Sequence, residues 1–236
     1  MSPRLHRLRA RINKRIARLI APLAPEQAKY LAAMAYWHRR FADNGGKMRN
    51  AHYRFFCTEF FGLDKSDFDG LRLLDVGCGP RGSLEWADKA ARRVGLDPLA
   101  DRFRSLRTGA HAMEYVAAPA ERIPFPDGYF DCIFAFNSLD HTADPAASMR
   151  EMIRVLRAGG RLLAIVEVNH GPTRTEPHRL DPGFFAAFAD ALQTRDLRLY
   201  PVREDHNIYR SLREGEPDVP FDTARPAILA AHLVRV

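Results

Sequence analysis

Residues 71–87 read LRLLDVGCGPRGSLEWA, an apolar run that ends in a cluster of glycines. The run predicts a buried strand, and the residues after it predict a helix at 83–91. Gly77, Gly79 and Gly82 occupy the junction, where glycine lets the backbone approach a ligand closely and a helix N-terminus favours a negative group. This order of strand, glycine loop and helix indicates a cofactor site at the end of the strand.

The glycine spacing alone leaves two cofactors open. It matches the dinucleotide fingerprint, and Asp97 follows about twenty residues later, where a carboxylate accepts hydrogen bonds from ribose hydroxyls. NAD and S-adenosylmethionine both fit this pattern. Asp75 lies two residues before the first glycine, where it would repel a pyrophosphate and suits a ligand that carries an ammonium group.

Apolar strands and helices alternate along the rest of the chain. Gly159-Gly160 is predicted to end one of the helices. Continuous apolar strands between helices argue for a parallel sheet that is covered on both faces. The predicted strands are 71–76, 92–97, 113–118, 130–137, 161–168, 197–203 and 227–236, and the helices between them are 83–91, 145–157 and one near 182–193.

The amino-terminal region predicts helices at 3–20, 26–42 and 51–61. The second and third hold most of the nine aromatic residues found between Tyr30 and Phe61, out of 24 in the chain, and this density suggests a cap over a site. The first is basic and amphipathic, and such a helix can lie on an anionic membrane. Packing of its apolar stripe on its own domain or on a second subunit is the preferred interpretation, because aromatic anchors are missing; a targeting peptide is a third. The stripe recurs at steps of three and four residues: Leu5, Leu8, Ile12, Ile16 and Leu19.

The net charge of +7 belongs to the amino terminus, because residues 21–236 balance 29 basic against 29 acidic side chains. A neutral body lacks the clustered cations that nucleic-acid binding needs, so nucleic acid is not an expected partner. Three scattered cysteines indicate a reducing compartment rather than a disulfide framework. Since the chain lacks an apolar run of ~20 residues and a signal-peptide core, we expect a cytoplasmic protein, with attachment to a membrane surface as an alternative.

Three motifs carry a resemblance to a known family: LDVGCG at 74–79, AERIPFPDGYFD at 120–131 and VLRAGGRLL at 155–163. Over about residues 60–170 the chain resembles the class I S-adenosylmethionine-dependent methyltransferases. The resemblance implies a three-layer, Rossmann-like α/β fold with a seven-stranded sheet whose last strand is antiparallel. It also implies S-adenosylmethionine as cofactor and a methyltransferase domain at 61–236. Residues 1–60 are then the helical cap that the aromatic density suggests.

The resemblance assigns cofactor contacts residue by residue. Two positions depart from the family pattern: Arg81 stands where many relatives have their third glycine, and Pro119 stands where relatives often have an aspartate. The roles carried over are Asp75, Gly77, Cys78 and Gly79 at the methionine moiety, Asp97 at the ribose, Pro98 and Leu99 beside adenine, Ala120 and Glu121 at the adenine edge, and Asn137 and Ser138 near the transferred methyl group.

Candidate catalytic residues cluster after the fourth and fifth strands, at the strand ends where α/β sheets bind ligands. His141 ends the SLDH segment at 138–141, and His170 and His178 lie in the polar stretch 167–180. Each histidine is a candidate base or substrate contact. Asp140, Glu167 and Glu176 accompany them, but the spacing is not the helical i, i+4 pattern of zinc proteases, so no metal site is expected.

These observations predict transfer of a methyl group to a small-molecule, sugar or glycan, or lipid-like acceptor. The residues at 137–140 read NSLD, which disfavours the (D/N)PP(Y/F) segment of enzymes that methylate adenine or glutamine amides. Two alternatives stay open: an NAD(P)-dependent oxidoreductase, and a non-catalytic module that binds S-adenosylmethionine.

Overall fold

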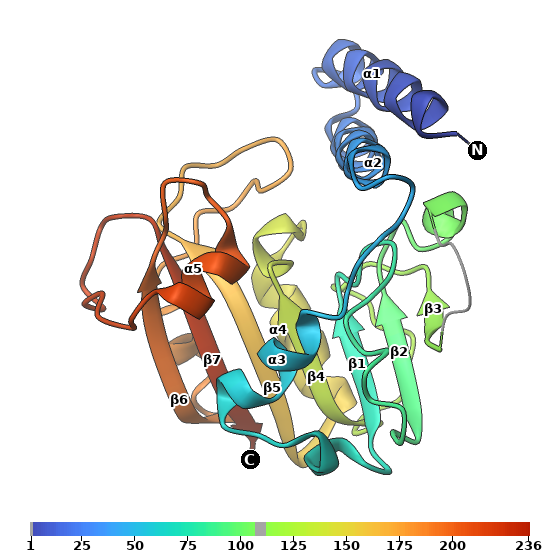
Figure 1. The fold of residues 1–236 in the computed structure, drawn as a ribbon. Helices are drawn as coiled ribbons and strands as arrows, with labels where there is room; N and C mark the ends of the chain where they lie inside the picture. The colour runs from blue at the N-terminus through green and yellow to red at the C-terminus, as the bar shows by residue number, and fades with distance from the viewer. Residues whose placement is uncertain (1, 107–111) are drawn as a thin grey trace.

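The computed structural model describes residues 2–106 and 112–236, and its centre is a seven-stranded sheet with helices on both faces (Figure 1). The strand order is β3-β2-β1-β4-β5-β7-β6. β7 runs antiparallel to β5 and β6, whereas the other pairs are parallel. This confirms the predicted fold class. The strands are β1 Arg72–Val76, β2 Arg92–Leu96, β3 Glu114–Val116, β4 Phe130–Phe136, β5 Leu156–Val168, β6 Leu192–Pro201 and β7 Ala227–Arg235.

β4 shows how the strand sequence builds two cores. Its side chains alternate between the faces, as the two-residue period of a strand requires. Ile133 and Ala135 belong to the core beneath α4 (Pro145–Val155), whereas Phe134 and Phe136 belong to the core on the other face. The second core also receives Phe56 of α3 (Tyr53–Cys57) and Leu212 of α5 (Ile208–Glu214). A helix layer on each face therefore buries a strand that is apolar except for the half-buried Asp131 near its start.

Two long helices, α1 (Pro3–Ile20) and α2 (Pro25–Asp43), lie over the carboxyl ends of β1 and β2 (Figure 1). α2 packs on a separate apolar cluster in which Met34 and Phe41 meet Leu99 and Phe103. Both helices agree with the predicted ranges.

The predicted packing of the α1 stripe on the chain's own domain is wrong, because the stripe stays exposed; packing on a second subunit stays a prediction. α1 contacts α2 through its buried residues His6, Ala10 and Ala17, and Nδ1 of His6 lies 2.8 Å from Nδ1 of His38. The small side chains allow close helix packing, so the face chosen for contact is not the face with the most leucine. Leu8 and Leu19 of the stripe stay 51% and 78% exposed.

Several predicted helices are also shorter or absent. Residues 83–91 form turns instead of a helix, because side chains satisfy backbone carbonyls there: Asn50 donates to Gly82 O and Arg93 donates to Glu85 O. Helix 51–61 is reduced to α3 followed by a 3-10 turn, and the helix near 182–193 is a 3-10 segment, Phe184–Phe188.

The glycine pair predicted to end the helix before the fifth strand lies inside that strand instead. α4 ends at Val155, and β5 begins at once. Gly159 has a φ of 70° in the stretch where the pairing of β5 with β4 shifts register. The glycines therefore form an irregularity in the strand rather than a helix cap. No helix in the described ranges is both long and apolar enough to cross a membrane.

Phe134→Ala should lower the free energy of unfolding by about 3–5 kcal/mol, because it leaves a cavity in the core beneath α3. Phe134 is 0% exposed, and its ring centroid lies 5.7 Å from that of Phe68. The measurement is urea unfolding followed by circular dichroism. Phe221→Ala is the matched control, since Phe221 is 47% exposed; equal losses in the two variants would contradict the assigned core.

Candidate active site

The glycine loop leaves β1 in a conformation that favours glycine. Gly77, Gly79 and Gly82 have φ values of 73°, 60° and 70°, a region that residues with a Cβ rarely adopt. A Cβ on Gly77 would lie 2.3 Å from Cβ of Ser138, and a Cβ on Gly82 would lie 2.6 Å from Sδ of Met113. Glycine therefore lets the loop pack directly against the residue that follows β4.

Two carboxylates hold this loop by its backbone. Asp75 is 4% exposed, and its Oδ2 accepts a hydrogen bond from Ser83 N at 2.7 Å. Oδ2 of Asp97 accepts one from Gly79 N at 3.0 Å, and its Oδ1 accepts one from Leu99 N at 2.8 Å. Burial raises the pKa of Asp75 to about 7, although the hydrogen bonds from Ser83 oppose the shift. Both residues shape the loop, and their contacts with a ligand stay predictions.

Two polar groups just past β4 face this loop. Asn137 has a φ of 51°, and its N–H donates to Ile165 O at 2.6 Å. Among the described residues, neither Oδ1 of Asn137 nor Oγ of Ser138 has a hydrogen-bond partner, although both atoms are buried. Buried polar atoms without partners are rare and mark positions where a ligand or water binds.

The residues predicted around adenine differ in exposure. Pro98 is exposed, whereas Leu99 and Ala120 are 4% and 7% exposed. Leu99 contributes to the cluster beneath α2. Pro98 is thus the accessible apolar residue of this set, and contact of any of the three with adenine stays a prediction.

The Glu121 carboxylate is engaged by the backbone before α4. Its Oε1 accepts hydrogen bonds from Ala143 N at 2.5 Å and Asp144 N at 3.0 Å. His178 reaches the same segment, where its Nε2 lies 2.9 Å from Ala143 O. Glu121 and His178 thus fix a turn in this structure, and roles at adenine and at the acceptor stay predictions for them.

The predicted cap covers the glycine loop from the other side. An atom of the Trp37 indole lies 3.1 Å from the position of a Cβ on Gly79. A cavity of about 190 Å³ lies between the amino-terminal region and the loop, and Trp37, Asn50, Tyr53 and Cys78 are among the residues that line it. Asn50 is a contact that the sequence did not predict: its Nδ2 donates to Gly82 O at 3.2 Å. No motif surrounds Asn50, so only the folded chain shows it.

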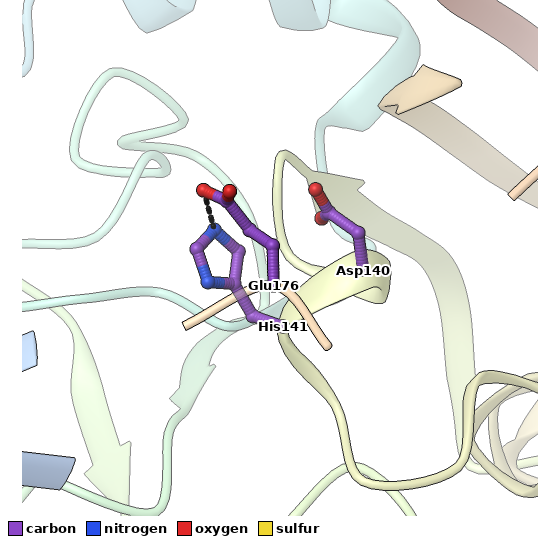
Figure 2. A group of neighbouring side chains, drawn as sticks. All are labelled: Asp140, His141 and Glu176. Carbon is purple, nitrogen blue, oxygen red and sulfur yellow. Dashed lines mark ion pairs between the residues drawn. The ribbon is translucent and has the colours of Figure 1, made fainter. Parts of the chain in front are cut away.

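The loops after β4 and β5 bring together four side chains, which we call the loop cluster: Asp140, His141, His170 and Glu176. Nε2 of His170 lies 3.4 Å from Oδ2 of Asp140, and this carboxylate raises the pKa of His170 to about 9. Nε2 of His141 lies 3.6 Å from Oε1 of Glu176 (Figure 2). Since Asp140 is two residues past Ser138, the loop cluster adjoins the glycine loop.

Comparison with known proteins supports S-adenosylmethionine as the cofactor. The family model described as a methyltransferase domain (Methyltransf_11) matches residues 74–164. A ubiquinone/menaquinone biosynthesis C-methyltransferase, UbiE of Pseudomonas putida, is 36% identical over 167 residues, which are 65% of this chain and 63% of that protein. The match thus spans less than two thirds of this relative.

Solved structures share the fold. An S-adenosylmethionine-dependent methyltransferase from Mesorhizobium loti aligns with a TM-score of 0.52 and 20% identity, over 72% of this chain and 92% of that one. The [4+2]-cyclase SpnF aligns with a TM-score of 0.52 and 22% identity, over 71% and 74%. Because a cyclase has this fold too, the fold by itself does not fix the reaction.

The strand order and the glycine loop define a Rossmann-like, cofactor-binding domain. The matched family model and relatives make the assignment more specific: residues 74–164 match a methyltransferase domain, the chain is similar to C-methyltransferases over about two thirds of its length, and these findings support S-adenosylmethionine as the cofactor. The residues fit this cofactor, because Oγ of Ser138 lies beside Gly77 and, like Oδ1 of Asn137 one residue earlier, is buried without a hydrogen-bond partner among the described residues, so both oxygens can accept hydrogen bonds from an ammonium group. Neither the matched family nor these relatives support the NAD(P)-dependent alternative.

Asp97→Ala should weaken S-adenosylmethionine binding at least tenfold, about the contribution of one charge-assisted hydrogen bond. Isothermal titration calorimetry measures this directly. Asp101→Ala is the control, because the Asp101 side chain is 69% exposed and its ion pair with Arg104 lies at the surface. Unchanged affinity in a folded Asp97→Ala protein would remove Asp97 from the cofactor site.

Proposed function

We propose that this chain transfers a methyl group from S-adenosylmethionine to a small-molecule acceptor by in-line displacement. The observation that carries the proposal is the adjacency of the glycine loop and the loop cluster, through the contact of Gly77 with Ser138. One end of the site has the groups that suit the cofactor, and the other has polar side chains that suit an acceptor. The relative named as a C-methyltransferase supports a small-molecule acceptor.

The main task of the protein in this reaction is to position the methyl donor and the acceptor. S-adenosylmethionine supplies an electrophilic methyl group on a sulfonium when it is bound. The chain must place the acceptor atom behind that methyl group, and correct placement can supply about 7–11 kcal/mol of the barrier. Ser138 and Asn137 would hold the donor end, and the loop cluster would hold the acceptor.

His141 is the predicted histidine with the greater access to an acceptor, since its side chain is 35% exposed. The His170 side chain is 16% exposed, and its Nε2 is buried beside Asp140, which is 0% exposed. His178 is half-buried and its Nε2 lies 2.9 Å from Ala143 O, which supports a place at the edge of the site.

The cap would exclude water from the reacting groups. Trp37 covers Gly79, and the ring of Phe103 lies edge-on to Trp37 with centroids 6.3 Å apart. A rigid aromatic cover over the cofactor loop lowers the local dielectric and prevents loss of the methyl group to water. This supports the interpretation of residues 1–60 as a functional cap.

Incubation of the purified protein with S-adenosylmethionine should give a methylated product with one acceptor class. The panel contains sugars and glycans in one arm and hydroxylated aromatic compounds with isoprenoid tails in the other. Mass spectrometry detects the gain of one CH2 unit, and Asp97→Ala serves as the negative control. Tight cofactor binding with no transfer in either arm would contradict the proposal and favour the non-catalytic module.

We also propose that α1 attaches the protein to an anionic lipid surface. The α1 stripe is exposed along its length, with Leu5, Leu8 and Ile12 at 40%, 51% and 46%. Leu23, just past the helix, continues the stripe at 91% exposed. An apolar face of this size costs free energy in water unless something covers it.

Charge favours lipid over a second copy of the chain. Seven basic side chains of α1 are exposed, and the helix has no acidic residue to pair with them in a symmetric contact. Each Lys or Arg near an anionic membrane contributes about 1 kcal/mol. A helix that buries its leucines and holds basic residues at the headgroups has the geometry of interfacial helices. The basic residues are Arg4, Arg7, Arg9, Arg11, Lys14, Arg15 and Arg18.

The double variant Leu8→Gln/Leu19→Gln should reduce co-sedimentation with phosphatidylglycerol vesicles at least tenfold, because two leucines leave the apolar layer. The matched control is Phe221→Gln/Val236→Gln, which changes residues that are 47% and 66% exposed elsewhere. Binding should also fall with added salt. A stable dimer that the double variant dissociates, without vesicle binding, would contradict attachment to lipid.

A further inference from the structure

The loop cluster contains a set of ligand atoms that sequence spacing could not reveal. Asp140 and His141 come from the 3-10 helix after β4, and Glu176 comes from the loop after β5. One oxygen or nitrogen atom from each of the three side chains lies within 4.8 Å of the others (Figure 2). Atoms that share a cation with bonds of about 2.0–2.2 Å lie roughly 3–4 Å apart, so small side-chain shifts would close the set.

Asp140 is the strongest indication that a cation belongs here. The residue is 0% exposed, and neither carboxylate oxygen accepts a hydrogen bond from the described residues. A buried carboxylate without hydrogen bonds is costly unless a positive charge compensates it. Nε2 of His170 lies 3.4 Å from Oδ2 of this carboxylate. The other oxygen, Oδ1, is without a hydrogen-bond partner among the described residues.

His141 is oriented as a metal ligand is. Its Nδ1 lies 2.9 Å from Thr175 O, so that nitrogen carries the proton and donates it to the carbonyl. This leaves Nε2, which lies 3.6 Å from Oε1 of Glu176, as the nitrogen that can bind a cation when the ring is neutral. Histidines that bind metals usually donate their other ring N–H to a carbonyl or carboxylate. His170 similarly supports Asp140, since its Nε2 lies 3.4 Å from Oδ2 of that carboxylate.

The surrounding charge also favours a cation. Glu167 lies on β5 near the cluster, and the pKa of its carboxyl is raised first by burial and then by the charges of Asp140 and Glu176. Lys29 of α2 faces these acids, and burial lowers the pKa of its ammonium group. Three carboxylates thus share a region that His170 and Lys29 only partly neutralise.

We propose that Asp140, His141 and Glu176 bind one divalent cation, and that this cation holds an oxygen atom of the methyl acceptor. Two carboxylates and one imidazole suit Mn²⁺ or Zn²⁺, whereas Ca²⁺ prefers sites made of oxygen ligands alone. The part concerning the acceptor rests on the proposed function, whereas cation binding does not. This inference departs from the expectation of no metal site, which rested on the spacing of His170, Glu176 and His178.

Calorimetric titration of the full chain with MnCl2 and with ZnCl2, after removal of metals and without cofactor or acceptor, tests the site. We expect saturable binding of one cation per chain. Asp140→Asn, His141→Gln and Glu176→Gln should each weaken it more than about 100-fold, since losing a residue that only orients a ligand costs 10–100-fold. His178→Gln is the control, because its Nε2 is held by Ala143 O.

Electron spin echo spectroscopy of bound Mn²⁺ gives an independent readout. Nitrogen modulation from one imidazole should appear in the wild type and in His178→Gln, and vanish in His141→Gln. Calorimetric titration with S-adenosylmethionine separates loss of the site from loss of the fold, since the variants should keep cofactor affinity. Absence of saturable binding for both ions, or binding that survives Asp140→Asn and His141→Gln together, would overturn the proposal even if no acceptor is found.

Discussion

Two carboxylates fix the glycine loop through hydrogen bonds to its backbone, and the site depends on this constraint. Asp75 accepts a hydrogen bond from the amide of Ser83 at the far end of the loop, and Asp97 accepts one from the amide of Gly79 at the near end. These bonds bend the chain sharply after β1, so the loop lies against the end of β4 rather than over open solvent. A loop held in advance does not pay its ordering entropy when the cofactor binds, which is the physical meaning of preorganisation. The cost is the burial of Asp75, seen in its raised pKa.

The parallel sheet turns this local constraint into a site. β1 pairs with β4, and β4 pairs with β5, so the carboxyl ends of all three strands meet at one edge. Residues that are far apart in sequence, such as Gly77 and His170, are brought to this edge by strand order alone. The antiparallel β7 sits beyond β5 and begins at the same edge, because Ala227 pairs with Val168. The segment before it also contributes there, since Nδ2 of Asn169 donates to Thr223 O. The fold thereby places the glycine loop and the loop cluster at neighbouring positions along one edge of the sheet.

The sequence predicts the strands better than the helices, and it predicts the glycine loop but not which side chains meet after β4 and β5. A buried strand is indicated by its own apolar run, as in β4. The segment 83–91 has helical spacing, but side chains from outside it hydrogen-bond its carbonyl at Glu85, from Arg93, and the carbonyl of Gly82 just before it, from Asn50. Helical spacing similarly marked the α1 stripe as a packing face, although contact with α2 uses the small residues on another side. The pairing of Asp140 with His170 joins two loops, and no spacing rule encodes it.

The amino-terminal helices connect the exposed surface of the protein to the cofactor loop. α1 packs on α2 through the buried contact of His6 with His38, and burial lowers the pKa of His38 to about 4, so this ring is neutral at physiological pH. α2 in turn places Trp37 on Gly79. Two helices joined by a short turn, with small residues between them, move as one unit more readily than they separate. Whatever covers the leucine stripe of α1 therefore acts one helix away from the glycine loop, and a surface that anchors α1 also fixes the direction from which an acceptor enters.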